Sequence, residues 1–369
     1  MKKTIKCLMH YVPTENEEYR RCSLAAAAKA EYLFSCFQRL GYRVEILSAC
    51  PSEQGSAKGG IREIFPGIIL ETLPCLGRGN GVKNALSTVS FRLTLWRRLW
   101  QFVREGDVLW VYHSLPLMRP IRILKRFRKF RLLLELEELY GDVLGAAAIR
   151  NRELRFARLA DGFLFPVREL ERTVNRGGKP AVICYGPYRF WETGMLAEDT
   201  IHVVYAGSAL PEKGVFLAMD AAEHLPEGYH VHILTEDTPQ IRSHLARKQC
   251  RCRLTFDGLL TGQAFPDFLG TCRVGLCTQS TAAAFNETSF PSKILTYLGA
   301  GLQVVCGRIP AVEHSDVGRY LRYYEEESPR AVAEAILRAA EESDTGKQIL
   351  RTLDASFRKA VEELLETLG

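Results

Sequence analysis

The 369-residue sequence lacks any apolar run of the roughly 18 residues that a membrane-spanning helix needs. It also lacks a CxxC motif and zinc-ribbon spacing, although it contains 11 cysteines. This odd number of scattered cysteines, without a recognisable signal peptide, predicts free thiols in a reducing, cytoplasmic setting. No segment repeats at the period of a solenoid, so the chain is expected to form globular domains.

The composition is that of a soluble protein, but the charge is unevenly distributed. Apolar residues make up 47% of the chain and charged residues 25%, with a net charge of +6. Residues 1–186 carry 31 Lys+Arg against 18 Asp+Glu, whereas the remainder carries 18 against 25. This asymmetry predicts two domains with different partners, the first of which faces something anionic.

Apolar, strand-like segments alternate with helical segments along the whole chain. The pattern predicts an α/β fold with two Rossmann-like, doubly wound parallel-sheet domains facing a cleft, closed by C-terminal helices. The expected strands of the first domain are Ile5–Val12, Tyr42–Ala49, Asp107–His113, Arg131–Glu137, Gly162–Val167 and Ala181–Gly186. Those of the second are His202–Ser208, Tyr229–Thr235, Cys252–Leu260, Arg273–Thr278 and Gln303–Gly307.

The same pattern sets the expected domain boundaries. The N-terminal domain covers residues 1–186, a Pro- and Gly-containing linker covers 187–200, and the C-terminal domain covers 201–345. Residues 346–369 form a closing helix, for which the N-terminal domain is one candidate packing partner.

Two turns of the second domain combine small residues with a lysine. In YAGSALPEKGV (Tyr205–Val215), a strand leads through a turn to a helix that we expect to begin near Lys213. In SFPSKILTYLGAGLQVVCG (Ser289–Gly307), a helix begins at Pro-Ser-Lys, so Lys293 opposes the helix dipole. A bound anion would remove that conflict, and two such turns would suit a diphosphate. Plain βα turns with solvated lysines are the alternative.

These segments resemble GT-B glycosyltransferases, in particular glycosyltransferase family 4 and its relatives with a Phe-Pro-Ser-Lys motif. The resemblance covers about Val203–Val305 and rests on YAGSALPEKG, FDGLL, RVGLCT and FPSKILTYLGAGLQVV. It implies that the second domain binds a nucleotide-diphosphate sugar, UDP- or GDP-linked, as substrate and that no cofactor is needed. By resemblance, the diphosphate contacts are Gly207, Ser208, Lys213, Ser292 and Lys293. The base would meet the backbone of Gly258, Leu259 and Leu260, and the sugar or ribose would meet Glu287, Thr288 and Thr296.

The chain departs from this family in two places. The first turn usually reads Gly-Arg, whereas here it is Gly207-Ser208. Two glutamates eight positions apart are usual, and their places fall on Thr288 and Thr296, with Glu287 one position away from the first. Thr296 can hydrogen-bond a hydroxyl but cannot supply a carboxylate. A catalytically idle relative that binds a sugar nucleotide or a partner transferase therefore stays open, and so does a sugar-nucleotide epimerase.

Two strand ends of the first domain carry polar side chains. His113 is either a packed or capping histidine or a residue that faces the sugar, as a polar residue often does in the family. Glu137 and Glu138 are either solvated carboxylates at a helix start or cleft carboxylates that orient an acceptor hydroxyl or take its proton. These three are the candidate catalytic residues. Arg20 or Arg21, after the first strand, could also reach a phosphate.

Residues 91–131 are strongly basic and amphipathic, with 11 Lys+Arg against 2 acidic residues. The segment FRLTLWRRLWQFVR places aromatic side chains among arginines, which suits an anionic membrane surface. Ordinary outer helices of a wound sheet would show a similar pattern. Nucleic acid is not expected, because no recognition motif accompanies the charge.

Together these features predict a metal-independent glycosyltransferase, since no DxD-type motif follows a predicted strand. The acceptor would be a glycan or a lipid-linked molecule in surface polysaccharide or lipopolysaccharide assembly. The expected location is the cytoplasm, with peripheral attachment to the inner face of the membrane as a further possibility.

Overall fold

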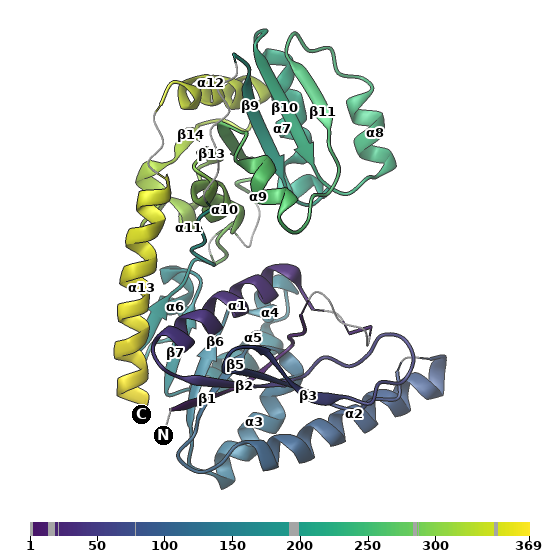
Figure 1. Ribbon diagram of the computed structural model, residues 1–369, viewed down its shortest axis with the longest axis vertical. Helices are drawn as coiled ribbons and strands as arrows, with labels where there is room; N and C mark the ends of the chain where they lie inside the picture. The colour runs from purple at the N-terminus through teal and green to yellow at the C-terminus, as the bar shows by residue number, and fades with distance from the viewer. Residues whose placement is uncertain are drawn as a thin grey trace. The chain divides into compact units, whose positions relative to one another are not determined.

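The computed structural model of the protein divides into two compact units, each with its own sheet (Figure 1). Unit 1 comprises Met1–Pro187 with Phe357–Gly369, and unit 2 comprises Tyr188–Ser356. The described residues are 3–13, 19–20, 22–77, 79–191, 199–282, 286, 288–342 and 346–369. Glu287 and part of the expected linker lie outside them.

Unit 1 is built on an eight-stranded sheet. Its strands are β1 Thr4–Met9, β2 Arg43–Ser48, β3 Gly60–Phe65, β4 Ile68–Thr72, β5 Val108–Tyr112, β6 Arg131–Glu135, β7 Gly162–Phe165 and β8 Ala181–Ile183. Their order is β3-β4-β2-β1-β5-β6-β7-β8. Within the described residues every neighbouring pair is parallel except β3 and β4, which are antiparallel. The switch point of the sheet lies between β1 and β5, because successive strands are added on opposite sides of this pair.

The β3–β4 hairpin was not predicted from the sequence. β3 is an edge strand in which all residues but one are exposed, so it has no buried face to produce an apolar alternation. Gly67, with φ of +76°, makes the turn into β4. Edge strands of this kind are defined by their pairing rather than by their composition.

The helices of unit 1 cover the sheet. They are α1 Leu24–Arg39, α2 Gly81–Phe102, α3 Leu115–Phe127, α4 Tyr140–Val143, α5 Ala147–Ala157 and α6 Arg168–Val174. The fully buried Trp110 of β5 meets Phe34 and Phe37 of α1 edge to face, with ring centroids 5.7 and 5.1 Å away. No described helix combines the length and the apolarity needed to cross a membrane.

Unit 2 has six parallel strands in the order β11-β10-β9-β12-β13-β14. They are β9 Ile201–Ala206, β10 Tyr229–Leu234, β11 Arg253–Phe256, β12 Val274–Cys277, β13 Gln303–Gly307 and β14 Arg322–Tyr324. Numbered within the unit, this order is that of a dinucleotide-binding Rossmann domain, with the switch point between β9 and β12.

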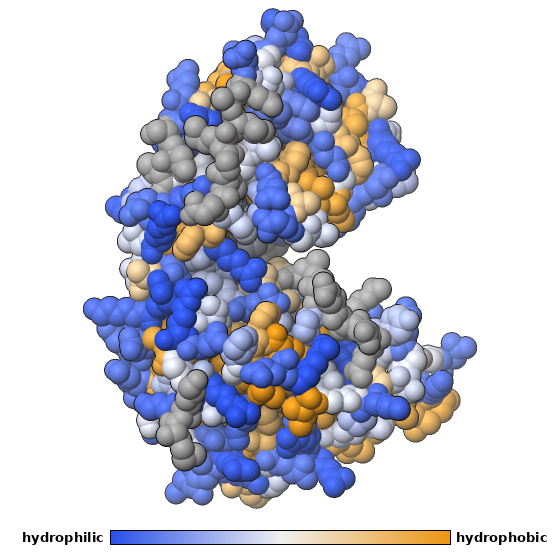
Figure 2. Space-filling model, viewed as in Figure 1, coloured by the Kyte–Doolittle hydropathy of each residue, from blue (hydrophilic) through white to orange (hydrophobic). Residues whose placement is uncertain are grey.

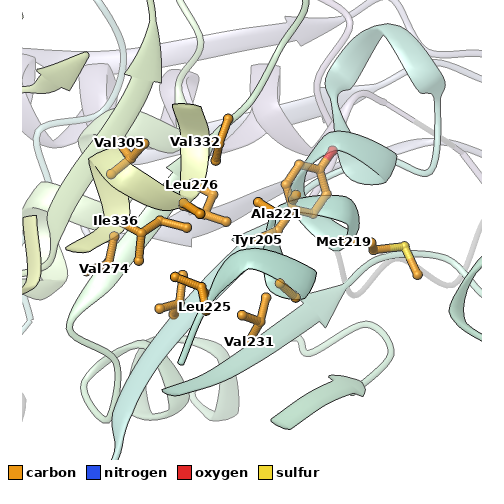
Figure 3. Packing of buried hydrophobic residues seen from close by; sticks show 14 of the residues in the cluster. Tyr205, Met219, Ala221, Leu225, Val231, Val274, Leu276, Val305, Val332 and Ile336 are labelled. Atoms are coloured by element: carbon orange, nitrogen blue, oxygen red, sulfur yellow. The ribbon is translucent and has the colours of Figure 1, made fainter. Parts of the chain in front are cut away.

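Seven α-helices begin within the described residues of unit 2. They are α7 Val215–Ala221, α8 Pro239–Leu245, α9 Ala264–Leu269, α10 Lys293–Ala300, α11 Pro310–Glu313, α12 Pro329–Ala340 and α13 Gly346–Leu368. Figure 3 shows the core on one face, where strand residues such as Val231 and Leu276 meet Ala221 of α7 and Ile336 of α12. The last part of α13 belongs to unit 1, where Leu364 lies against Gly162 of β7.

Candidate functional site

The two lysine-bearing turns lie at the switch point of unit 2. The segment after β9 contains Gly207, Ser208 and Lys213, and the segment after β12 leads to α10, which begins at Lys293. In open α/β sheets the strand order reverses at such a point, which leaves room for a ligand at the carboxyl ends of the strands. The tertiary structure therefore brings both predicted turns to one edge of one sheet.

The Lys293 ammonium is buried at this edge. Its Nζ atom is inaccessible to solvent and has no hydrogen-bond partner among the residues that the structure describes. It lies over the Tyr205 ring, 4.1 Å from the ring centroid. A Cβ atom at Gly207 would come within 2.6 Å of Nζ, so glycine at this position makes room for the ammonium. A buried cation with only an aromatic ring to satisfy it is an uncommon arrangement outside a binding site.

Burial, together with the positive charge of Lys213, lowers the pKa of Lys293 to about 8 against the opposing influence of Cys277. This repulsion agrees with the position of both turns at the switch point. Lys213 Nζ donates a hydrogen bond to Gln279 Oε1 at 3.3 Å. An anion between the lysines would relieve both the repulsion and the loss of hydration.

A helix begins near Lys213, as expected, and a short turn precedes it. A short 3₁₀ turn, Pro211–Lys213, ends at this lysine, and α7 begins at Val215. Gly214 separates them with φ of +82°, and a Cβ atom there would lie 1.7 Å from the carbonyl oxygen of Thr278. Position 214 therefore requires glycine, because the loop after β12 lies too close to its backbone for a side chain.

An amide network that was not predicted from the sequence holds that loop. Gln279 Nε2 donates to Asn286 Oδ1 at 2.6 Å, and Asn286 Nδ2 donates to the carbonyl oxygens of Ser280 and Thr281. Both amide side chains are buried, at 4% and 2% exposure. The network holds the Gln279 side chain in place, and Gln279 accepts the hydrogen bond from Lys213. A residue after β12 therefore positions a lysine that follows β9.

Ser208 and Ser292 flank the two lysines. The Ser208 carbonyl accepts from the Tyr205 hydroxyl at 3.0 Å, and its Oγ accepts from the Leu210 amide at 3.2 Å. Ser292 is the exposed N-cap residue of α10, and its side chain makes no capping bond. The first amide groups of α10 are therefore not capped by the Ser292 side chain.

The remaining predicted donor contacts are spread more widely. Thr296 Oγ1 donates to the Ser292 carbonyl at 3.4 Å on α10, Thr288 is half-buried, and Glu287 is outside the described residues. Gly258, Leu259 and Leu260 follow the edge strand β11, where Gly258 has φ of +73° and Leu259 is 61% exposed.

In unit 1, the His113 side chain is buried and does not face solvent at the carboxyl end of β5. It is 2% exposed, and its Nε2 lies 2.7 Å from Oε1 of Glu153, which is also fully buried. Glu153 accepts two further bonds from the amides of Tyr140 and Gly141. This arrangement favours the packed-histidine alternative, because Glu153 ties β5 to the start of α4.

Glu137 forms an ion pair with Lys29 of α1. Lys29 also lies 3.7 Å from Glu135, which accepts from Trp110 Nε1 at 2.9 Å. Burial would lower the pKa of Lys29, but the two carboxylates raise it, and burial raises the pKa of Glu135 to about 8. Glu137, with a side chain 26% exposed, is the member of this triad that reaches the surface. Glu138 beside it is half-buried.

Lys29 was missed in the sequence because it lies in an alanine-rich helix that gives no sign of a site. His10, after β1, was missed as well, and its Nε2 lies 3.2 Å from Oγ of Ser114 at the switch point of unit 1. The suggestion that Arg20 reaches a phosphate was wrong. Its guanidinium is 2% exposed and donates to the carbonyls of Cys50 and Leu73, so it holds loops together. Arg21 lies outside the described residues.

No family model and no curated protein matches the sequence. Solved structures do match it. An Escherichia coli structure described as trehalose-6-phosphate bound with UDP-2-fluoro glucose has a TM-score of 0.67 at 11% identity, covering 99% of both chains. The UDP-forming α,α-trehalose-phosphate synthase from Burkholderia xenovorans, in complex with glucose-6-phosphate, has a TM-score of 0.67 at 13% identity over 100% of both chains. The corresponding Burkholderia vietnamiensis synthase has a TM-score of 0.66 at 12% identity, covering 100% of this chain and 98% of that one. The α/β fold of two parallel-sheet domains predicted from the sequence is confirmed, and it is the GT-B fold.

Proposed function

We propose that the protein is a glycosyltransferase of the GT-B class, related to family 4, that takes a sugar from a UDP- or GDP-linked donor. The observation that carries the proposal is the buried Lys293 ammonium, which has no hydrogen-bond partner in the described part of the chain. Lys213 and the first turn of α10 add positive potential at the same edge of the sheet. The similarity to structures that hold UDP-2-fluoro glucose and glucose-6-phosphate supports a nucleotide-sugar donor.

The chemistry follows from where charge develops. When the glycosidic bond breaks, the leaving diphosphate gains negative charge. Lys213, Lys293 and the amide groups of α10 stabilise that charge without reorganising, because their positions are fixed before the reaction. The predicted transfer uses these groups in place of a divalent metal.

The departures from the family pattern define what this donor site lacks. Ser208 stands where an arginine is usual, so the site has one cation fewer for the diphosphate. Thr296 stands in the place of the ribose-binding glutamate and contributes a hydroxyl only. These two residues favour the second candidate, a catalytically idle relative that binds a sugar nucleotide or a partner transferase.

Unit 1 is the proposed acceptor domain. Glu137 is the proposed acceptor-orienting group, since it is partly exposed just after the carboxyl end of β6 and forms an ion pair with Lys29. His113 and Glu138 are weaker candidates, because His113 is buried against Glu153.

A nucleotide-binding experiment tests the donor site. We expect UDP or GDP to raise the melting temperature of the full chain, since a ligand at 100 times its Kd adds about 2.7 kcal/mol of stability. Lys293→Met and Lys213→Met should each remove most of that rise. Arg330→Met is the matched control, because Arg330 is 81% exposed on α12 and its loss removes a charge without touching the site. No response to any nucleoside diphosphate would contradict the proposal.

Turnover separates the two candidates. The protein is mixed with UDP- and GDP-sugars, and release of the nucleoside diphosphate is followed with and without glycan and lipid-linked acceptors. Transfer, or slow donor hydrolysis that Lys293→Met abolishes, supports the enzyme. Nucleotide binding without release under any condition supports the idle relative.

We further propose that unit 1 attaches to an anionic membrane surface. Apolar residues recur every three or four positions along one side of α2 and are exposed, with exposed fractions from 36% to 76%. They are Val82, Leu86, Val89, Leu93, Trp96 and Trp100. The opposite side of α2 is packed into unit 1 through buried residues such as Phe91 and Leu95. In Figure 2, apolar surface interrupts the hydrophilic surface in the region of α2.

The charge beside this stripe fits acidic lipids. Trp100 packs on Phe127, with ring centroids 6.0 Å apart, and the Arg128 guanidinium lies 5.1 Å from the Trp100 ring. Further exposed basic residues lie on α2, on α3 and in the loops that follow these helices: Arg92, Arg97, Arg104, Arg122, Arg126 and Lys129. Each basic residue near an anionic surface contributes about 1 kcal/mol, and the stripe supplies apolar anchors. A lipid-linked acceptor in surface polysaccharide or lipopolysaccharide assembly, at the cytoplasmic face, would explain this surface.

A further inference from the structure

We propose that His202, His230 and His232 bind a divalent first-row transition-metal ion such as Zn²⁺ or Ni²⁺. One ring nitrogen from each of the three histidines lies within 4.8 Å of the other two. Imidazole nitrogens are the ligands that these metals prefer, and three of them with a water molecule complete a tetrahedral site. The site is independent of the proposed transferase function.

The sheet itself brings these rings together. His202 of β9 and His230 of β10 are direct partners in the parallel register, and His232 is two residues farther along β10. Residues two apart on a strand point to the same face, so all three side chains share one face of the sheet. The neighbouring residues Val203 and Val231 point to the other face, into the core under α7 and α12.

The rings are already close to the spacing that a metal needs. Nδ1 of His202 lies 2.8 Å from Nε2 of His232, and the ring centroids of His230 and His232 are 3.7 Å apart. Two nitrogens bound to zinc at about 2.0–2.1 Å in tetrahedral geometry are about 3.4 Å apart. A small side-chain rotation would therefore open the His202–His232 pair enough to admit the ion.

A second layer of polar groups orients the rings. Asp257 Oδ2 lies 3.1 Å from Nδ1 of His232, which leaves the Nε2 atom of that ring to face the cluster. The hydroxyl of Thr255 lies 2.9 Å from Nε2 of His230 and 2.9 Å from the same Asp257 oxygen. A carboxylate behind a ligating histidine is the usual outer shell of a zinc site.

Burial suits a neutral, metal-binding cluster. His230 and His232 are 6% and 5% exposed, whereas the half-buried His202 provides access. Arg253 pairs with His230 from β11 and opposes a bound cation, and Asp257 offsets it.

The cluster lies away from the proposed donor site. His202 and His230 are each the second residue of their strand, whereas Gly207 follows the carboxyl end of β9. Five residues of strand at about 3.3 Å each separate His202 from Gly207 by roughly 16 Å. A metal here would link β9 to the outer strands β10 and β11 rather than take part in sugar transfer.

The test is metal titration of the full chain after treatment with EDTA. Ni²⁺ is the first probe and Zn²⁺ the second, because the half-buried Cys22, Cys250 and Cys272 would compete mainly for zinc. Calorimetry should show one Ni²⁺ per chain, and the metal should raise the melting temperature reversibly. His202→Ala and His232→Ala should each weaken binding at least about tenfold, and His224→Ala, on the exposed His224, should not.

Two variants leave all three rings in place and so guard against unfolding. Asp257→Asn should weaken Ni²⁺ binding about 10–100-fold, as loss of outer-shell partners does. Arg253→Gln should tighten it, because a nearby positive charge is removed. The proposal is overturned if neither metal binds to the wild-type chain, or if His202→Ala binds Ni²⁺ as well as His224→Ala does.

Discussion

The Lys293 ammonium lies 4.1 Å from the centre of the Tyr205 ring, inaccessible to solvent and without a hydrogen-bond acceptor among the described residues. This relationship places a cation in the first turn of α10, where the helix dipole already disfavours positive charge. The unliganded fold is therefore less stable than it could be at this position. Such a conflict is expected where a site is arranged for a ligand of opposite charge.

Replacement of Lys293 by methionine should expose that conflict. We expect the unfolding free energy of the unliganded protein to rise by about 1–3 kcal/mol, because an unpaired buried charge is replaced by an apolar side chain of similar length. Nucleotide affinity should fall at least about tenfold. Urea denaturation and calorimetry measure the two effects, with Arg330→Met as the control that should change neither. A loss of stability together with unchanged affinity would show that Lys293 is only structural.

Gly207→Ala should displace the ammonium without removing it. The added Cβ would lie 2.6 Å from Lys293 Nζ, so the flexible lysine end must move. We expect a stability change within about 1 kcal/mol, because only the far end of a long side chain shifts, and a loss of nucleotide affinity of about tenfold. Gly177→Ala is the control, since no atom lies within 4 Å of a Cβ at that glycine. Equal affinities for the two variants would contradict the proposed role of the turn.

The unfolding free energy and the nucleotide affinity should both depend on pH through the ionisation of Lys293. Its pKa is about 8 in the folded protein and 10.5 without burial, so the unfolded chain binds more protons between these values. Stability contributed by this group therefore rises with pH from about 8 to 10.5, and the penalty of burying the charge is fully present below pH 8. The stability advantage of Lys293→Met should be largest near pH 7 and shrink toward pH 10. Nucleotide affinity of the wild-type protein should fall above pH 8, as Lys293 loses its proton.

Glu153→Gln should destabilise unit 1. The carboxylate accepts bonds from His113, Tyr140 and Gly141, and an amide in its place would point a donor at one of these groups. We expect a loss of about 2–4 kcal/mol in urea denaturation followed by circular dichroism. Glu105→Gln, on an exposed glutamate, should lie within about 0.5 kcal/mol of the wild-type protein. An equally stable Glu153→Gln variant would show that the buried cluster does not hold α4 in place.

Charged substitutions on α2 should release the protein from anionic vesicles. Leu86→Glu and Leu93→Glu change side chains that are each 60% exposed, so the fold should tolerate them. We expect binding to phosphatidylglycerol vesicles to fall at least about tenfold, with weak binding to phosphatidylcholine throughout. Leu259→Glu, on the 61% exposed Leu259 of unit 2, is the matched control. If the wild-type protein does not bind vesicles but forms dimers that Leu93→Glu dissociates, the apolar side of α2 is a protein interface instead.

The sequence predicted most strands of the two sheets because a strand that is buried on both faces appears as a near-continuous apolar run. Gln303–Gly307 was predicted at its observed bounds, since all five of its residues are buried. The edge strand β3 was not predicted, because it is exposed and has no buried face to shape its composition. Lys293 was predicted as an anion contact from a local conflict, a cation in the first turn of a helix.

Only the tertiary structure decided which groups meet. Strand order and register determine three of these contacts. They place Lys293 over Tyr205, Lys29 beside Glu137, and the three histidines on one face of the sheet. The burial of His113 against Glu153, 40 residues away, also required the packed unit. These contacts join residues far apart in the chain, and their energies come from burial and geometry rather than from local propensity. A single sequence records which residues are present, whereas packing determines which charges lose water and therefore need a partner.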